Sequence, residues 1–163
     1  MNVLIKSLQD VICKMIRKSI LIVDDDQVIL KSLEGVLRIE GYRVDTAETG
    51  QEALRKFHDS FYNLVLLDIK LPDMDGTKLL SKIHMTEPKT MKIMVTGYPE
   101  LDNAVQSLNS GADAYLMKPV NPKMLLKVVK EKLGEQEEVE KMNEDKVSNW
   151  IETRVKKLKT GVA

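Results

Sequence analysis

The sequence predicts an α/β fold in which a five-stranded parallel sheet is doubly wound, with helices on both faces. Five short apolar segments alternate with amphipathic segments of helical periodicity, and this alternation is typical of consecutive β–α units. Ile20–Val23 and Leu64–Leu67 are uninterrupted aliphatic runs, as expected of strands that are covered on both faces. At 163 residues and 43% hydrophobic, the chain can form one domain with a core and additional terminal segments.

The strands are expected at the five apolar segments, and right-handed crossovers between parallel strands leave few possible topologies. The expected strands are Ser19–Val23, Tyr42–Thr46, Leu64–Leu67, Met91–Val95 and Ala114–Met117. Helices are expected where apolar residues recur every three or four positions. The expected helices are Val28–Glu40, Gln51–His58, Gly76–Met85, Leu101–Leu108 and Asn121–Leu133. Gly134 is the expected break after the last helix, because glycine commonly follows a helix C-terminus.

Two terminal segments flank the predicted domain, which spans residues 19–133. Residues 1–18 are expected to form an amphipathic extension, for which Met15 is an alternative start of translation. Residues 134–163 are expected to form a helical tail, with no effector domain. Within this tail, Glu135–Asp145 carries six acidic residues against one lysine, whereas Lys146–Lys159 carries five basic residues against one glutamate.

The basic half of the tail also carries an apolar stripe. The stripe consists of Val147, Ile151, Val155 and Leu158 at helical spacing, with Trp150 beside them. Because an isolated helix of this length is marginal in water, the stripe should be buried against another surface. Three occupants remain open: the domain itself, a second copy of the chain, for which the opposite charges favour antiparallel pairing, or a partner such as a kinase.

Composition excludes several classes of protein. Lysine plus arginine equals aspartate plus glutamate, 25 each, so DNA binding is not expected. Cys13 is the single cysteine, which excludes an internal disulfide framework and a cysteine-based zinc site and favours a cytoplasmic location. No apolar run approaches the roughly 20 residues that cross a bilayer, so no membrane span is expected.

Unusual polar residues follow four of the predicted strands. Asp24–Asp26 follow the first strand, Asp68 the third, Thr96 the fourth and Lys118 the fifth. Because the carboxyl ends of parallel strands meet at one edge of a sheet, these side chains are expected to form a single site.

The residue types at this edge indicate phosphoryl chemistry. Crowded carboxylates repel one another and favour a divalent cation with oxygen ligands, such as Mg²⁺. A carboxylate can also attack phosphorus, and Asp68, which follows a central strand, is best placed to do so. Lys118 and the Thr96 hydroxyl can then contact other phosphoryl oxygens, which is the positioning that phosphoryl transfer requires.

The segments ILIVDDD, LVLLDIKLPDMDG, KIMVTGY and AYLMKP resemble the receiver domain of two-component response regulators, including chemotaxis regulators. This resemblance covers about residues 18–133 in order and spacing. It implies a flavodoxin-like sheet with strand order 2-1-3-4-5.

The resemblance also implies a role for each site residue. Asp68 matches the phosphoacceptor. A divalent ion, Mg²⁺ or also Mn²⁺, would be held by Asp24, Asp25, Asp68 and the backbone carbonyl of Ile69, with Asp25 a direct ligand. The residues that match the phosphoryl-binding and switch positions are Thr96, Lys118 and Tyr115, and the Lys118–Pro119 bond is typically cis in this family. Lys70 and Tyr98 match positions that tune the lifetime of the phosphoryl group.

By the same resemblance, the chain is expected to be a single-domain response regulator. It would accept a phosphoryl group from a sensor histidine kinase or a phosphotransfer protein, and it would signal to an output protein by protein–protein contact. It would catalyse only its own phosphorylation and dephosphorylation. A homodimer is possible through the face formed by the helix at 101–108, the strand at 114–117 and the helix at 121–133, or through the tail.

A hydrolase is the alternative from a different class. Asp24–Val28 fits the Asp-x-Asp-x-Val motif of haloacid-dehalogenase-like phosphatases, in which Asp24 would be the nucleophile and Asp26 the acid/base. That family needs one more strand after Lys118, followed by a further acidic pair. The sequence after Lys118 is predicted to be helical. It also leaves Asp68 without a role.

Overall fold

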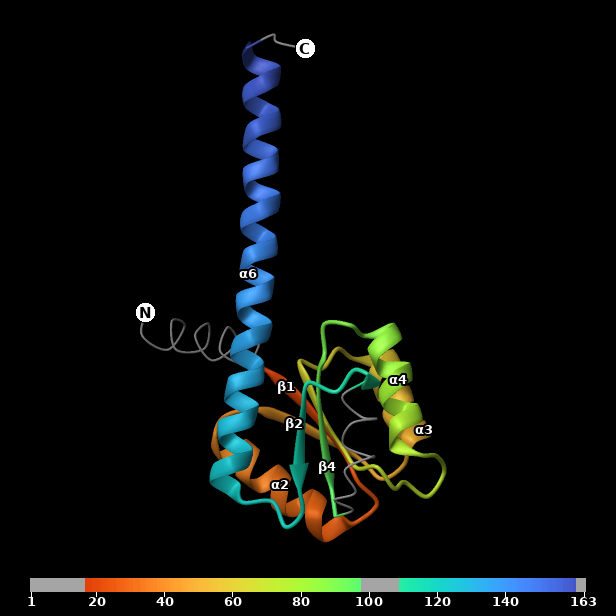
Figure 1. The fold of residues 1–163 in the computed structure, drawn as a ribbon. Helices are drawn as coiled ribbons and strands as arrows, with labels where there is room; N and C mark the ends of the chain where they lie inside the picture. The colour runs from red at the N-terminus through yellow and green to blue at the C-terminus, as the bar shows by residue number, and fades with distance from the viewer. Residues whose placement is uncertain (1–16, 98–108, 161–163) are drawn as a thin grey trace, which may run out of the picture.

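The computed structural model describes residues 17–97 and 109–160, which form a five-stranded parallel sheet with a helix that extends far beyond it (Figure 1). The strands lie in the order β2-β1-β3-β4-β5, and every neighbouring pair is parallel. Their bounds are β1 Ser19–Val23, β2 Arg43–Ala47, β3 Leu64–Leu67, β4 Met91–Thr96 and β5 Ala114–Met117. The predicted fold class and strand order are therefore confirmed, and β2 begins and ends one residue later than expected.

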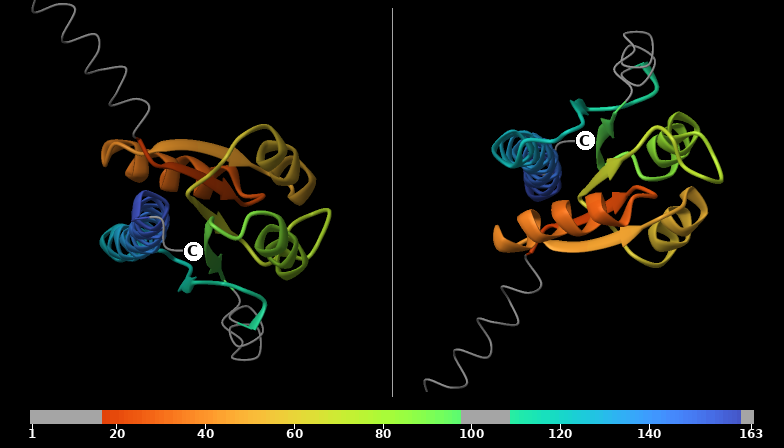
Figure 2. Two further views of the ribbon diagram at one scale, coloured as in Figure 1. Left: turned by 90° about the horizontal axis from the view of Figure 1, so that it is seen from above. Right: turned by 90° about the horizontal axis from the view of Figure 1, so that it is seen from below.

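Four described helices cover the two faces of the sheet. Their bounds are α2 Gln27–Ile39, α3 Gly50–Asp59, α4 Gly76–Thr86 and α6 Pro122–Thr160. α2 and α6 lie on one face, and α3 and α4 lie on the other (Figure 2). The helix expected over Leu101–Leu108, and all but the last two residues of the extension expected over residues 1–18, lie outside the described residues.

The core consists of two apolar layers separated by the sheet. In the first layer, Leu33 of α2 and Val129 of α6 belong to the same buried cluster as Ile22 of β1. In the second, Phe57 of α3 and Leu80 of α4 pack with residues from the opposite face of the same strands. β1 and β3 are buried along their full length, as their unbroken aliphatic sequences predict.

The expected break at Gly134 is wrong, because α6 continues through this residue to Thr160. Glycine costs about 1 kcal/mol relative to alanine inside a helix, and good helix formers on both sides offset that cost here. Lys132 Nζ and Glu135 Oε1 form an ion pair of 2.8 Å across the position. The domain and the tail are thus joined by one uninterrupted helix.

Gln136 extends the packing of the domain past the expected boundary at Leu133. Its side chain is 4% exposed, and its Nε2 donates hydrogen bonds to the carbonyl oxygens of Asn63 at 3.1 Å and Lys89 at 2.6 Å. Asn63 Nδ2 donates in return to Gln136 Oε1 at 3.1 Å. These bonds hold α6 against the edge of the sheet two residues after the glycine.

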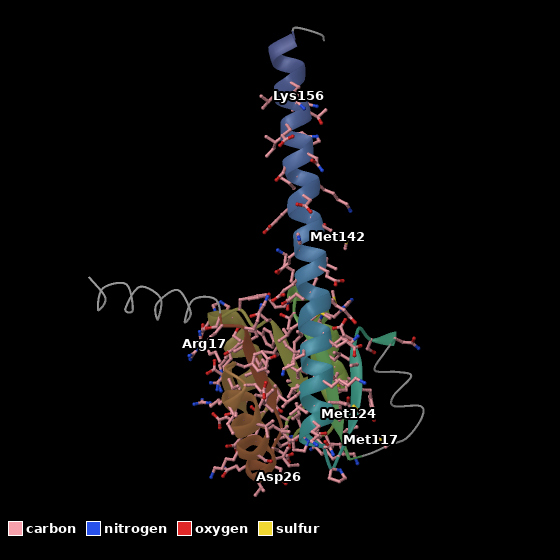
Figure 3. The ribbon with its side chains drawn as sticks, turned by 90° about the vertical axis from the view of Figure 1, so that its left-hand side faces the viewer. Arg17, Asp26, Met117, Met124, Met142 and Lys156 are labelled. Carbon is pink, nitrogen blue, oxygen red and sulfur yellow. The ribbon has the colours of Figure 1, made fainter. Side chains whose placement is uncertain are left out.

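Beyond this anchor the tail does not fold back onto the domain. The side chains described from residue 141 to residue 156 are all exposed. In Figure 3, Met142 and Lys156 lie on the part of α6 that projects away from the sheet. Docking on the domain's own described surface, one of the three expected occupants of the apolar stripe, is therefore wrong.

Among residues 17–97 and 109–160, no helix combines the length and the apolar character needed to cross a membrane.

Candidate functional site at the carboxyl edge of the sheet

Asp68 lies directly after β3, the central strand of the sheet. The residue is 7% exposed, and its Oδ1 accepts a hydrogen bond of 2.8 Å from the backbone N–H of Ile69. Its own N–H donates to the carbonyl of Val23 at 2.9 Å, which continues the pairing of β3 with β1 by one residue. The backbone therefore holds this carboxylate at a defined place on the sheet edge.

Two further carboxylates, from the end of β1, converge on Asp68. One ligand oxygen from each of Asp24, Asp25 and Asp68 can be chosen so that all lie within 4.8 Å of one another. Asp24 is 2% exposed, whereas Asp25 is exposed to solvent. This oxygen-only, anionic set is of the kind that suits Mg²⁺ or Mn²⁺, as the sequence predicts.

Asp26, the third residue of the acidic triplet, caps a helix and is not part of the carboxylate cluster. Its side chain caps α2 by accepting hydrogen bonds from the N–H groups of Val28 at 2.8 Å and Ile29 at 3.3 Å. An acid/base role for Asp26, which the hydrolase alternative requires, has no support in this geometry. In Figure 3, Asp26 and Met117 lie at the same end of the molecule, which locates the carboxyl ends of β1 and β5 on one edge.

Lys118 reaches the acidic cluster from the end of β5. Its Nζ lies 2.6 Å from Asp24 Oδ2 and 3.3 Å from Asp68 Oδ2. The backbone N–H of Lys118 donates to the carbonyl of Thr96 at 2.8 Å, and the Lys118–Pro119 peptide bond is cis, as the resemblance implies. One ammonium group thus contacts two carboxylates that come from two other strands.

The charges at this edge change the proton affinities of the side chains. Burial raises the pKa of Asp68 and the charge of Asp24 raises it further, while Lys118 opposes both effects. For Lys118, burial alone would lower the pKa, but its bonds and charge interactions with Asp24 and Asp68 outweigh burial, so the pKa is raised. Lys118 therefore stays protonated at neutral pH, and the cluster keeps a net negative charge that favours a cation.

The remaining predicted residues are Thr96, Tyr115, Lys70 and Tyr98. Thr96 is fully buried at the end of β4. Tyr115 is half-buried, and burial and the charge of Asp68 raise its pKa. Lys70 is exposed and forms an isolated backbone bridge with Asp75. Tyr98 lies outside the described residues.

Gly76 is a site residue whose role the sequence analysis missed. A Cβ at this position would lie 2.1 Å from the carbonyl oxygen of Asp68 and 2.8 Å from the Cα of Ile69. The Gly76 N–H also donates a hydrogen bond of 2.6 Å to the Ile69 carbonyl, the oxygen that resemblance assigns to the metal. The sequence signal was the Asp75-Gly76 pair, which marks a turn but not the backbone that the glycine approaches.

Asp73 fixes the other side of this loop. Its two carboxylate oxygens accept hydrogen bonds of 2.9 Å from the N–H groups of Gly50 and Gln51, at the start of α3. Although desolvation opposes the effect, these backbone donors lower the pKa of Asp73. The loop that follows the acceptor is therefore tied to a neighbouring helix.

Comparison with known proteins identifies the same unit. Residues 20–130 match the family model of the response regulator receiver domain. A solved receiver domain protein from Methanospirillum hungatei, described as CheY-like, is 59% identical with a TM-score of 0.73, and the match covers 75% of this chain and 98% of that one.

Curated relatives of this chain are longer regulators. The transcriptional regulatory protein ZraR of Klebsiella oxytoca is 41% identical over 102 residues, which are 63% of this chain and 23% of the relative. The cell cycle response regulator CtrA of Brucella ovis is 34% identical over 109 residues, which are 66% of this chain and 46% of the relative. The chain thus spans less than half the length of these relatives.

Proposed function

Because the chain belongs to the response regulator receiver domain family, we propose that it is a phosphorylation switch in which Asp68 accepts the phosphoryl group. The observation that carries the proposal is the convergence of Asp24, Asp25, Asp68 and Lys118 at one edge of the sheet. An Asp68 oxygen forms the new bond to phosphorus as the donor's own bond to phosphorus breaks. The donor would be a sensor histidine kinase or a phosphotransfer protein.

Asp24, Asp25, Asp68 and the Ile69 carbonyl would hold a divalent cation, with Asp25 as a direct ligand. The clustering of three carboxylates, two of which contact the Lys118 ammonium, supports this assignment. Mg²⁺ in this position supplies positive charge that offsets the repulsion between Asp68 and an incoming phosphoryl group. Lys118 would exchange its contact with Asp24 for one with a phosphoryl oxygen.

Thr96 and Tyr115 would convert phosphorylation into a change of surface. Phosphorylation adds nearly two negative charges and three acceptor oxygens, which the Thr96 hydroxyl would approach. Tyr115 would then turn inward, and the surface around β5 and α6 would change for a partner that reads it. Lys70 and Tyr98, two residues after Asp68 and Thr96, would tune how long the phosphoryl group survives.

The donor protein would dock beside the site, over the start of α2 and the end of β5. A groove of about 510 Å³ lies there, lined by residues that include Val28, Ile29, Pro119 and Lys118. Val28, which is 76% exposed, would offer an apolar side chain to the donor protein there. The output would be a separate protein, reached by protein–protein contact.

Phosphorylation by a small donor tests the proposal. The protein is incubated with Mg²⁺ and acetyl phosphate, and the acyl phosphate is located by mass spectrometry. We expect the label on Asp68, with none on the Asp68→Asn variant and little on Asp25→Asn. Asp26→Asn is the matched control, because asparagine also caps a helix and this variant should be labelled normally. Label on Asp24 together with hydrolysis of phosphate esters would support the hydrolase alternative instead.

A further inference from the structure

The projecting part of α6 carries a row of exposed apolar side chains that the domain does not cover. Trp150 is 61% exposed and Val147 is 57% exposed, and other apolar residues along this part of the helix are also exposed. The other exposed apolar residues are Val139, Met142, Ile151 and Val155. This row lies at the end of the molecule opposite Asp26, so it is separate from the phosphorylation site (Figure 3).

One face of this helix continues from the domain to the end of the row. Gln136, Glu140, Asn143, Val147, Trp150, Arg154 and Lys157 follow one another at alternating intervals of four and three residues, the spacing of a two-helix seam. Gln136 anchors this face to the sheet edge, and Val147 and Trp150 form its apolar centre. A helix that packs along this seam would bury the apolar centre.

A groove between this face and the domain prolongs the seam. It has a volume of about 1010 Å³, and its lining from the domain includes Lys89, Met91 and Asp113. Its lining from α6 includes the face residues Gln136, Glu140, Asn143 and Val147. Among all its lining residues the groove holds four acidic side chains (Asp113, Glu135, Glu140 and Glu144) and one basic side chain, Lys89. It therefore favours a basic, partly apolar segment.

The chain itself contains such a segment in the last turns of the same helix. Lys146–Lys159 carries five basic residues and one acidic residue, with apolar residues between them. The groove lies beside the acidic half of α6, and a straight helix cannot bring its own basic end back to its acidic half. The basic end of α6 can therefore enter such a groove only on another molecule.

We propose that α6 pairs in antiparallel orientation with α6 of a second copy of this chain, and that the basic end of each helix enters the acidic groove of the other copy. Centred between Val147 and Trp150, this pairing sets Val147 of each copy against Trp150 of its partner, and Glu140 against Lys157. In a parallel pairing, Glu140 of one copy would face Glu140 of the other, and Arg154 would face Arg154. Like charges that face each other across a seam are unfavourable. The proposal concerns a surface remote from Asp68 and does not depend on its phosphorylation.

Sedimentation of the 163-residue chain tests the pairing. We expect a dimer that dissociates on dilution, together with a red shift in the emission of Trp150, the sole tryptophan. Trp150→Ala should weaken the dimer by about tenfold or more, as expected for a central aromatic at an interface. Met85→Ala, which truncates an 82% exposed residue on α4, is the control and should not change the dimer. If the chain sediments as a monomer at every concentration, the proposal is refuted, whatever the emission of Trp150.

Charge reversal tests the contact between Glu140 and Lys157. Glu140→Lys and Lys157→Glu should each weaken the dimer, and the double variant should recover most of the loss. Glu138→Lys is the matched control, because residue 138 lies on the opposite side of the helix from the seam. These residues lie outside the core, and unchanged thermal unfolding would show that the domain is intact. Equal effects of Glu140→Lys and Glu138→Lys would contradict the contact.

Cross-linking tests the orientation in a Cys13→Ser background. A short bismaleimide should join a Glu140→Cys molecule to a Lys157→Cys molecule when the two are mixed. It should not join two Glu140→Cys molecules, because residues 140 of the two copies would be about 26 Å apart along the helices. Efficient linking of Glu140→Cys to itself would indicate a parallel dimer and overturn the proposal.

Discussion

The Nζ atom of Lys118 donates a hydrogen bond of 2.6 Å to Oδ2 of Asp24, although 94 residues separate the two in the sequence. The bond joins the end of β5 to the end of β1 across the central strands of the sheet. The same ammonium group lies 3.3 Å from Asp68 Oδ2. Lys118 therefore compensates two buried carboxylates at once.

Replacing Lys118 with methionine should destabilise the metal-free protein. The variant leaves two nearly buried carboxylates without their ammonium partner, and we expect the free energy of unfolding to fall by about 3 kcal/mol. Mg²⁺ should restore more stability in the variant than in the wild type, since the cation offsets the same repulsion. Denaturant unfolding with and without Mg²⁺ measures both effects. Lys123→Met, at an exposed position of α6, is the control and should behave like wild type.

Gly76→Ala should disturb the loop after the acceptor. The added methyl group would lie 2.1 Å from the Asp68 carbonyl, so the backbone at Asp68 and Ile69 must move, at a cost of about 1–3 kcal/mol. Phosphorylation by acetyl phosphate should slow as well. Gly35→Ala is the matched control, because a Cβ at Gly35 meets nothing within 4 Å. Since Gly35 lies in the interior of α2, the free energy of unfolding should rise by about 0.5–1 kcal/mol in this variant. Similar stability changes in the two variants would contradict the close approach.

Lys92 makes the stability of the protein depend on pH. Its side chain is 3% exposed, and burial lowers its pKa although Asp113 Oδ2 lies 4.0 Å away and opposes the shift. Between this lowered pKa and the ordinary value of 10.5 the unfolded chain binds more protons, so the contribution of Lys92 to the free energy of unfolding rises with pH. We expect Lys92→Met to be more stable than wild type at pH 7, with a difference that shrinks as the pH approaches 10.5.

Urea unfolding of both proteins at a series of pH values measures this difference directly. Comparing the two proteins at each pH cancels the titration of the other groups. A difference that grows with pH would contradict the assignment of the shift to Lys92.

Thr96→Ala should separate phosphorylation from its response. Asp68, Asp24 and Lys118 remain in place, so the variant should be phosphorylated to nearly the same extent as wild type. Amide hydrogen exchange over β5, which contains Tyr115, should change less on phosphorylation than in wild type. Thr153→Ala, in the projecting part of α6, is the control. An equal exchange response in wild type and Thr96→Ala would remove Thr96 from the switch.

The sequence was sufficient for the sheet and for the residues at its edge. Apolar runs such as Leu64–Leu67 are strands that both helix layers cover. Parallel strands have their carboxyl ends at the same edge of the sheet, independent of the conformation of the connecting loops. The sequence alone therefore predicts that Asp24, Asp68 and Lys118 form one site.

Features that depend on distant contacts could not be predicted in the same way. At Gly134 the local signal indicated a helix end, but the bonds of Gln136 to Asn63 and Lys89 hold α6 in place beyond it. At Gly76 the requirement for glycine comes from the backbone of Asp68, eight residues earlier. The groove beside Glu140 requires Asp113 and Lys89 to meet α6, which no local pattern indicates.

The continuity of α6 through Gly134 makes the tail a stiff lever. Its foot packs in the core beside β5, the strand that carries Tyr115. From Gly134 to Thr160 the lever is about 39 Å long, so a tilt of about 10° at its foot would move its tip by about 7 Å. A slight rearrangement inside the domain would thus be magnified into a displacement large enough to separate or realign whatever the tip touches.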